Sequence, residues 1–288
     1  MDVAVVGGSV AGLQAALTLG RARLRVVLFD DGSPRNLAAS HVHNYLGVPS
    51  ASPAELLAVG LQQLREYDVE VRQLRVDGVV RSGGGFVVDG VEVRAVVLAT
   101  GLRDELPDVP GLAERWGRTV VACPHCHGWE VRDQPLVQLG LRDDPERSVA
   151  RALLLSRWSN QVTLCTGGPQ PDLTQLTRAG VTVRTEPVLK VTAGPRIHLS
   201  NGDELNPRMV FATVRQSQQS DLAERLGCAA SNGAVVTDPA GRTTIPGIYA
   251  AGTTTHPALL AIAAAGHAST VAVTVHSDLL ESELGGGR

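Results

Sequence analysis

The stretch that decides the fold is Val3-Ala4-Val5-Val6-Gly7-Gly8-Ser9-Val10-Ala11-Gly12, near the start of this 288-residue chain. The apolar run predicts a buried strand, the glycines predict a tight turn, and the apolar spacing over residues 13–19 predicts a helix. A second predicted strand, residues 25–29, ends on Asp30, 23 positions after Gly7. Strand, glycine turn, helix and a strand ending on an acid are typical of a Rossmann unit that binds a dinucleotide.

The glycine turn itself indicates how such a ligand would bind. Gly7, Ser9 and Gly12 occupy the three positions of the pattern that face a pyrophosphate, with the small residue Ser9 in place of the middle Gly. Asp30 stands where an acid binds the ribose hydroxyls. The alternative is a glycine-rich turn in an ordinary α/β domain, but the flanking elements and the distance to Asp30 favour a dinucleotide site.

The second chemical signal is Cys-Pro-His-Cys-His-Gly-Trp-Glu at residues 123–130. Two thiols separated by two residues can form and break a disulfide within one helical turn, and a helix N-terminus stabilises a thiolate. A disulfide exchanges two electrons, so a partner that accepts electrons in pairs must lie beside it. We therefore interpret the two signals together as a redox centre.

Zinc binding is the alternative reading of the same stretch. Cys123, Cys126 and His127 carry suitable ligand atoms, but a structural zinc site needs a fourth ligand and usually a second cysteine pair. The two other cysteines, Cys165 and Cys228, lie in no such pair. We expect no metal site, and we expect these two thiols to be buried or inert.

Composition and charge limit the possible partners. The chain is 43% hydrophobic and 19% charged, with a formal net charge of −3 and no block of basic residues. This balance argues against a nucleic-acid partner or an anionic membrane surface. No signal-like leader opens the sequence, and its apolar runs are too short to cross a bilayer. We therefore expect a cytoplasmic protein.

Other segments of the first half complete the expected ligand site. Residues 32–53 predict a loop over the ligand, in which Asn44 is a candidate contact and two histidines, His41 and His43, are more often solvent-facing than catalytic. The strand over residues 96–99 ends on Thr100-Gly101, where backbone can approach a ligand. Near the end of the chain, a short strand leads to Gly252-Thr253, and a long Ala-rich helix over residues 257–280 is expected to close the first domain.

A second α/β segment follows the linker at residues 106–111. A helix over residues 149–156 and a strand over residues 161–165 indicate another nucleotide-binding fold. Its phosphate loop is degenerate, because Leu-Arg-Asp-Asp-Pro-Glu at residues 141–146 puts carboxylates where a pyrophosphate needs bare N–H groups. Thr-Gly-Gly-Pro at residues 166–169 offers no Arg to hold the 2′-phosphate of NADP.

These elements predict an α/β fold with two Rossmann-like nucleotide-binding domains. Residues 1–108 and 231–288 form the first, which is discontinuous in sequence, and residues 109–230 form the second, which carries the dithiol and the degenerate NADPH loop. With its features in this order, the chain resembles the low-molecular-weight thioredoxin reductase family over nearly its whole length. Ordinary members carry an acid directly after the second Cys, where this chain has His127. Residues 123–135 are more similar to the gliotoxin- and holomycin-type dithiol oxidases of bacterial and fungal natural-product pathways.

The resemblance implies FAD as cofactor, a two-domain subunit and a homodimer. Carried over position by position, the residues implied to contact FAD are Gly7, Ser9 and Gly12 at the pyrophosphate, Asp30 at the adenosine ribose, Arg35 and Asn44 near the ribityl and flavin region, Thr100 and Gly101 on the other side, and Gly252 and Thr253 along the ribityl chain. The chain departs from the family at Thr253, where an Asp usually follows the Gly, and at Leu260, where thioredoxin reductases place a Gln.

By the same resemblance, Cys126 would lie next to the flavin, Cys123 would exchange with substrate, and His127 would move protons. Glu130 could orient His127 or stabilise the helix, and we favour the second role. The implied function is oxidation of a small-molecule dithiol to a disulfide, with electrons passing through FAD to oxygen. One alternative is a disulfide reductase that draws electrons from NAD(P)H or another donor. The other is a noncatalytic or repurposed flavin or redox protein.

Overall fold

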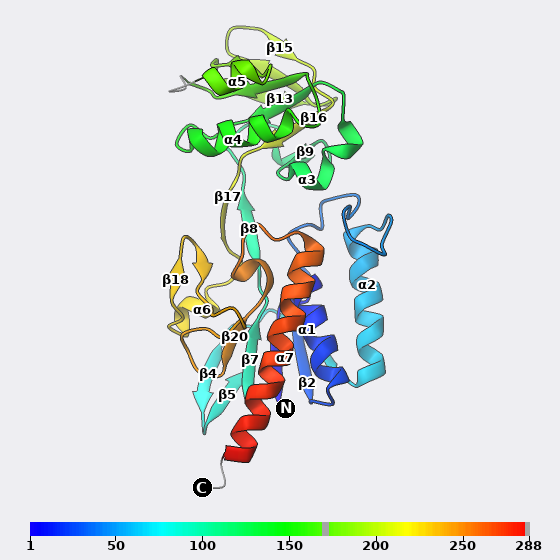
Figure 1. Ribbon diagram of the computed structural model, residues 1–288, viewed down its shortest axis with the longest axis vertical. Coiled ribbons are helices and arrows are strands. Elements are labelled where there is room, and N and C mark those ends of the chain that lie inside the picture. Colours follow the sequence, from blue (N-terminus) through cyan, green and yellow to red (C-terminus); the bar gives the residue numbers. More distant parts are fainter. Residues whose placement is uncertain (169–172, 286–288) are drawn as a thin grey trace. The chain divides into compact units, whose positions relative to one another are not determined.

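The computed structural model describes residues 1–168 and 173–285. The chain forms two compact units, both of mixed α/β structure (Figure 1). The first unit comprises Met1–Leu37, Tyr45–Arg103 and Gln216–Arg288, and the second comprises Ala38–Asn44 and Asp104–Arg215. The expected fold class is confirmed, with a discontinuous first unit. The domain limits at 108 and 231 stay a prediction.

The first unit is built on a parallel five-stranded sheet in the order β20-β7-β1-β2-β3. Its strands are β1 (Val3–Val6), β2 (Val26–Asp30), β3 (Glu70–Gln73), β7 (Ala95–Leu98) and β20 (Ile248–Ala250). Along β1, Val3 and Val5 face one hydrophobic cluster while Ala4 and Val6 face another. Both faces of this strand are covered, so the side chains that point to either face are apolar. This explains the continuous apolar run in the sequence.

The helices of the first unit are α1 (Val10–Arg21), α2 (Pro53–Leu64) with its 3₁₀ extension η1 (Arg65–Tyr67), α6 (Leu222–Arg225), η4 (Gly252–Thr254) and α7 (Ala261–Gly285). Helices α1 and α7 lie side by side and pack through small residues such as Ala15 and Ala268, each fully buried (Figure 1). A capping box at Ser52 and Glu55 starts α2. The predicted C-terminal helix begins four residues later than expected and continues to Gly285.

Short antiparallel strands complete this unit. They are β4 (Val79–Ser82), β5 (Gly85–Val88), β6 (Val91–Val93), β18 (Ala230–Ser231) and β19 (Ala234–Val235). Ser82 pairs with Gly85 across β4 and β5, so Gly83 and Gly84 form the turn of a hairpin. The chain passes between the two units at β8 (Leu102–Glu105) and β17 (Arg215–Gln218), which form a two-stranded sheet.

The second unit repeats the parallel sheet, in the order β12-β11-β10-β16-β9. Its strands are β9 (Val120–Val121), β10 (Leu136–Leu139), β11 (Val162–Cys165), β12 (Thr182–Arg184) and β16 (Met209–Ala212), with an antiparallel sheet of β13 (Val188–Thr192), β14 (Arg196–Leu199) and β15 (Glu204–Leu205). Its helices are η2 (Ala113–Arg115), α3 (Pro124–His127), η3 (Trp129–Val131), α4 (Pro145–Leu155) and α5 (Thr174–Arg178). No helix among the described residues of either unit is long and apolar enough to cross a bilayer.

Candidate functional site

The turn between β1 and α1 leaves the first N–H groups of the helix without a side-chain cap. Ser9 is the N-cap residue, but its side chain makes no capping hydrogen bond, and the first turn of α1 contains no acid. Gly7 has φ +104°, and a Cβ on Gly12 would collide with the carbonyl oxygen of Gly7. A helix N-terminus that has no side-chain cap and is preceded by a tight glycine turn can bind a phosphate group through its free N–H groups.

Asp30 lies at the carboxyl end of β2 and is tied to this turn. The Gly8 N–H donates a 3.0 Å hydrogen bond to Asp30 Oδ1, and a Cβ on Gly8 would collide with the Asp30 side chain. The hydrogen bond engages one carboxylate oxygen, so Oδ2 can accept a hydrogen bond from a ribose hydroxyl. The sequence spacing therefore corresponds to a direct contact in the fold.

The turns after β7 and β20 meet at the same edge of the sheet. Gly101 (φ +70°) donates its N–H to Thr254 Oγ1 at 2.8 Å, and a Cβ on Gly101 would lie 3.2 Å from Thr253 Oγ1. Gly252 (φ +69°) packs against Ala11 of α1, where a Cβ would lie 2.7 Å from the Ala11 methyl. Ligands bind at the carboxyl ends of parallel strands. These turns and the β1–α1 turn together form a cradle that could hold an extended dinucleotide such as FAD.

Two other residues expected near FAD lie in different units. Arg35 belongs to the first unit, a few residues beyond β2. Asn44, with φ +56°, ends the segment 38–44, which belongs to the second unit. Of the two, only Arg35 therefore shares a unit with the cradle.

Cys123 and Cys126 form a disulfide at the start of α3. Cys123 is the N-cap residue, Pro124 occupies the first helical position, and the Cys126 N–H donates to the Cys123 carbonyl at 3.2 Å. Helix α3 follows β9, the edge strand of the sheet, so the disulfide lies beyond a strand's carboxyl end. The other two cysteines are buried free thiols, as expected, and burial raises the pKa of Cys165 to about 12.

The segment around α4 supports the dithiol helix. A Cβ on Gly128 would lie 2.8 Å from the ring of Trp158, and the His125 ring meets the same indole edge-on at 5.4 Å. The guanidinium of Arg151 donates to the carbonyl oxygen of Ala122, just before Cys123. Trp158 was not among the predicted site residues, because no local sequence pattern links it to the cysteines.

A histidine cluster surrounds the residue after the second cysteine. The rings of His127 and His43 meet edge-on at 6.1 Å, His43 Nδ1 lies 3.6 Å from Glu130 Oε1, and His41 stacks on His43 at 5.7 Å. Burial lowers the pKa of His127, the charge of His43 lowers it further, and Glu130 raises it by less. His127 is therefore mainly neutral near neutral pH and able to accept a proton.

The turn between β10 and α4 contrasts with the turn between β1 and α1. The Asp144 side chain caps α4 by accepting the Arg147 N–H at 3.2 Å, and Glu146 lies in the first helical turn. Ser148 Oγ accepts the Leu141 N–H at 2.9 Å and donates to the Asp144 carbonyl at 2.8 Å. The chain's own oxygens thus occupy this helix N-terminus, and carboxylates lie where a pyrophosphate would need N–H groups.

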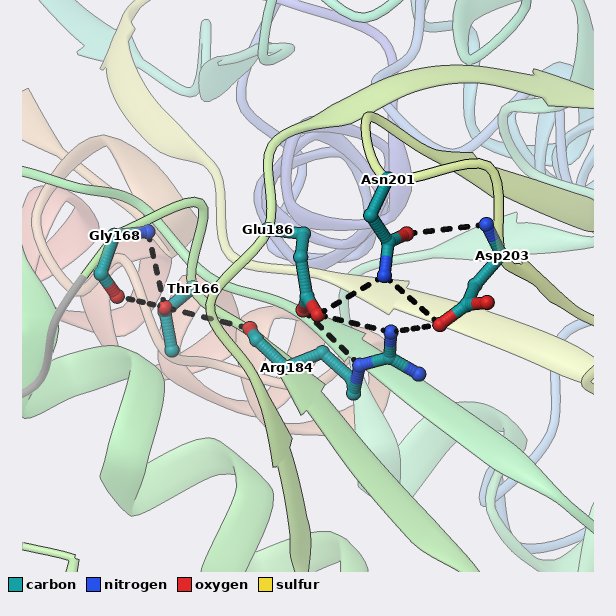
Figure 2. Close-up of polar contacts among 6 residues, drawn as sticks. All are labelled: Thr166, Gly168, Arg184, Glu186, Asn201 and Asp203. Carbon is teal, nitrogen blue, oxygen red and sulfur yellow. Dashed lines mark hydrogen bonds and ion pairs between the residues drawn. The ribbon is translucent and has the colours of Figure 1, made fainter.

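Figure 2 shows the polar network beyond β11 and β12 in the same unit. The Arg184 guanidinium donates to both oxygens of Glu186 at 3.0 Å and also contacts Asp203, and these hydrogen bonds lower the pKa of both carboxyls. The residues drawn are Thr166, Gly168, Arg184, Glu186, Asn201 and Asp203. Arg184 is thus neutralised by the protein itself.

Arg142 is a second arginine at this end of the sheet, and sequence reasoning missed it. A Cβ on Gly168 would lie 3.5 Å from its Nε and Nη2, so the guanidinium lies beside the turn after β11. The expectation that this turn carries no Arg holds for residues 166–168, but a neighbouring loop brings one there. Pro169, the last residue of that stretch, lies outside the described residues.

Comparisons with known proteins agree with this geometry. The pyridine nucleotide-disulphide oxidoreductase family matches residues 1–151 and 173–269. The crystal structure of an oxidoreductase from Agrobacterium tumefaciens is 34% identical, with a TM-score of 0.91, over 97% of this chain and 98% of that one. The crystal structure of HlmI is 35% identical, with a TM-score of 0.93, over 99% of this chain and 94% of that one.

A curated relative, the thioredoxin reductase sirT of Leptosphaeria maculans, is 29% identical over 279 residues, 87% of this chain and 85% of that one. These likenesses confirm the predicted family, the predicted FAD cofactor and the predicted enzyme class. The chain belongs to the pyridine nucleotide-disulphide oxidoreductase family, as an FAD-dependent, thioredoxin reductase-like thiol-disulfide oxidoreductase.

Proposed function

We propose that this protein is an oxidase that closes a disulfide in a small-molecule dithiol. One observation carries the proposal: α4 in the dithiol-bearing unit is capped by Asp144, whereas Ser9 leaves α1 uncapped. The first helix can bind the pyrophosphate of FAD, and the second offers no equivalent place for the pyrophosphate of NADPH. Electrons therefore enter from the dithiol. The likeness of residues 123–135 to natural-product dithiol oxidases supports the same direction.

The proposed FAD contacts follow the edge of the first sheet. The N–H groups around Gly7, Ser9 and Gly12 bind the pyrophosphate, and Asp30 binds the adenosine ribose. The remaining proposed contacts, at the ribityl chain and flavin, are Arg35, Asn44, Thr100, Gly101, Gly252 and Thr253. When bound, FAD would supply a two-electron acceptor for the Cys123–Cys126 dithiol, and oxygen would finally take the electron pair and two protons as hydrogen peroxide.

The protein's own part of the chemistry is thiol–disulfide exchange. A substrate thiolate attacks Cys123 Sγ, which breaks the Cys123–Cys126 bond, forms a mixed disulfide and releases Cys126 as a thiolate. The second substrate thiol attacks the substrate sulfur of that mixed disulfide, which releases a cyclic disulfide and the Cys123 thiol. The substrate loses two electrons, which the two cysteines hold as a dithiol, and Cys126 is the thiol proposed to pass them to FAD.

His127 serves as the proton acceptor in this exchange. Only a thiolate attacks a disulfide at a useful rate, so each substrate thiol must lose its proton. His127 directly follows Cys126 at the end of α3, and burial lowers the pKa of its imidazole so that it is mainly neutral near neutral pH. A neutral imidazole can take up these protons and pass them to solvent. The family resemblance leads us to propose a homodimer, and the cytoplasmic location expected from the sequence stays a proposal.

A reductase that draws electrons from NADPH is the second candidate, and Arg142 favours it. Its guanidinium lies beside the turn after β11, where an arginine could bind the 2′-phosphate of NADP. This candidate needs the pyrophosphate to bind without the α4 N-terminus, since Asp144 and Ser148 occupy it.

An anaerobic absorbance titration of the purified flavoprotein separates the two candidates. NADPH is added to one sample and dithiothreitol to another, and air is then admitted to both. For an oxidase, dithiothreitol bleaches the flavin, NADPH does not, and air restores the colour with formation of hydrogen peroxide. Bleaching by NADPH would reject the proposal and assign the reductase direction.

A further inference from the structure

The turn after β20 is held by a histidine from α7. The Gly252 N–H donates a 3.1 Å hydrogen bond to His267 Nδ1. The Gly252 carbonyl accepts from Thr255 Oγ1 at 3.1 Å and from the backbone N–H groups of Thr255 and His256 at 3.2 Å. The His256 ring packs edge-on against His267 at 5.0 Å. Both polar backbone groups of Gly252 are thus fixed by this small cluster.

The position of this cluster along the sheet connects it to FAD. Asp30 marks the adenosine half at β2, and the glycine turn after β1 marks the pyrophosphate. In the strand order β20-β7-β1-β2-β3, the turns after β7 and β20 lie on the opposite side of β1 from Asp30. A dinucleotide laid along this edge therefore places its flavin half over Gly101 and Gly252, whose turns are joined by the Gly101 hydrogen bond to Thr254.

The hydrogen bond determines the protonation state of His267. Nδ1 accepts the Gly252 N–H, so it carries no proton, and the neutral ring holds its proton on Nε2. A charged imidazolium has two N–H groups and no acceptor. Protonation of His267 must therefore break the bond to Gly252.

Among the described residues, the segments that pack around His267 contain no carboxylate that could stabilise its charge. Residues 10–20, 95–101 and 251–275, which include the facing part of α1 and both turns, contain no Asp, Glu, Lys or Arg. His256 is the only other titratable group in these ranges, and it packs on His267. Burial, and to a lesser degree the charge of His256, lower the pKa of His267.

We propose that His267 is a positioning residue for FAD, which fixes the Gly252–Thr253 turn through Nδ1 and releases the turn, and with it the flavin half of FAD, when it is protonated. The inference rests on the proposed placement of FAD along this edge and not on the dithiol-oxidase reaction. Gly252 needs its φ of +69° to bring Thr253 beside Gly101, and the His267 bond holds that backbone. The turn offers FAD hydroxyls and N–H groups without charge, so its shape matters for affinity.

The test is the affinity of the FAD-stripped protein for added FAD between about pH 5.5 and about pH 8, read by flavin fluorescence. Because the FAD-competent state requires neutral His267, affinity is full above the pKa of this group in the free protein and falls below it. The expected loss approaches about tenfold per pH unit while the FAD-bound form remains unprotonated. His267→Asn places an amide oxygen near the position of Nδ1 and cannot titrate. It should retain affinity at neutral pH and lose the acid dependence.

His267→Leu removes the acceptor altogether and should weaken FAD binding about tenfold at all pH values in this range. His276→Asn, about two and a half turns further along the same helix, is the matched control and should retain the wild-type pH dependence of FAD affinity. Persistence of the wild-type acid dependence in His267→Asn would overturn the proposal, as would wild-type affinity in a folded His267→Leu. If His267→Leu does not fold, the pH dependence of FAD affinity in His267→Asn alone tests the proposal. A protein that passes this test but leaves dithiols unoxidised refutes the oxidase proposal alone.

Discussion

Helices α1 and α4 occupy equivalent places, each after the central strand of a five-stranded parallel sheet, yet their N-termini are opposite in chemistry. The first begins at Ser9, whose side chain makes no cap, with no acid in the first turn. The second begins at Asp144, whose carboxylate caps the helix, with Glu146 one position beyond Pro145. Topology alone therefore does not show whether a Rossmann-like unit binds a dinucleotide. The side chains at the helix N-terminus decide it.

The largest expected effect is a loss of dithiol turnover in the second unit without a loss of FAD binding in the first. Cys123→Ser removes the sulfur proposed to meet substrate, and dithiol turnover should fall by at least about a thousandfold. FAD binding should remain, since the cradle belongs to the first unit. Turnover is measured as oxygen consumption with dithiothreitol, and FAD content by absorbance. Cys165→Ala, which changes a buried thiol of the same unit, is the control and should keep turnover. Undiminished turnover in Cys123→Ser would reject the assignment.

Transferring the chemistry of α4 to α1 tests the comparison directly. Ser9→Asp places a carboxylate at the α1 N-cap, where it should compete with and repel the pyrophosphate, so FAD affinity should fall by about a hundredfold. Asp144→Glu, at the equivalent cap of α4, is the matched variant and should leave FAD affinity unchanged. Flavin fluorescence titration measures both. Equal FAD affinity in Ser9→Asp and the wild type would mean that the pyrophosphate binds elsewhere.

His127→Gln should reduce dithiol turnover by about a hundredfold, since it removes the proposed proton acceptor while keeping a polar side chain. The loss of turnover should shrink as the pH rises toward the pKa of the substrate thiol, because the thiol then ionises without a proton acceptor. Rates measured from about pH 6 to about pH 9 test this. His198→Gln, a histidine on β14 of the same unit, serves as the control. A loss that is equal at all pH values would indicate a structural role.

The smallest expected effects are two pH shifts of opposite sign. Glu130 raises the pKa of His127, so Glu130→Gln should lower that pKa and move the acidic limb of the rate profile to lower pH. His43 lowers the same pKa, so His43→Gln should raise it and move the limb to higher pH. In each case the rate falls as pH drops through the pKa, because the proton acceptor must be neutral. If both variants shifted the acidic limb in the same direction, the proposed opposite effects of His43 and Glu130 on the pKa of His127 would be wrong.

The parts predicted best were those encoded by neighbouring residues. The strand, glycine turn and helix around Gly7 and Gly12 appear at the expected places. The spacing of apolar residues and the backbone conformations of glycine, which predict these elements, depend only on residues a few positions apart. The C-terminal helix was less well placed. Residues 257–260 lie outside the helix, which begins at Ala261 and is described as far as Gly285.

The environment of each functional side chain could not be predicted in the same way. His43 lies more than eighty positions before Glu130, and the sequence predicted only a loop residue for the first and a helix stabiliser for the second. The fold brings them within 3.6 Å of each other. His267 was not singled out at all, although it binds Gly252 across fifteen positions. Side chains of this kind show no period or spacing that would reveal their partners.

The sequence by itself determined the two sheets, the glycine turn, the acid at the end of β2 and the position of the dithiol at a helix start. Each of these depends on backbone dihedral preferences, burial period and hydrogen bonds between residues close in the chain. Only the tertiary structure decided that His127 lies against His43, that Arg184 is neutralised by Glu186 and Asp203, and that His267 holds the Gly252 turn. The reason is physical, because pKa values and hydrogen bonds depend on which groups folding brings into contact and removes from water.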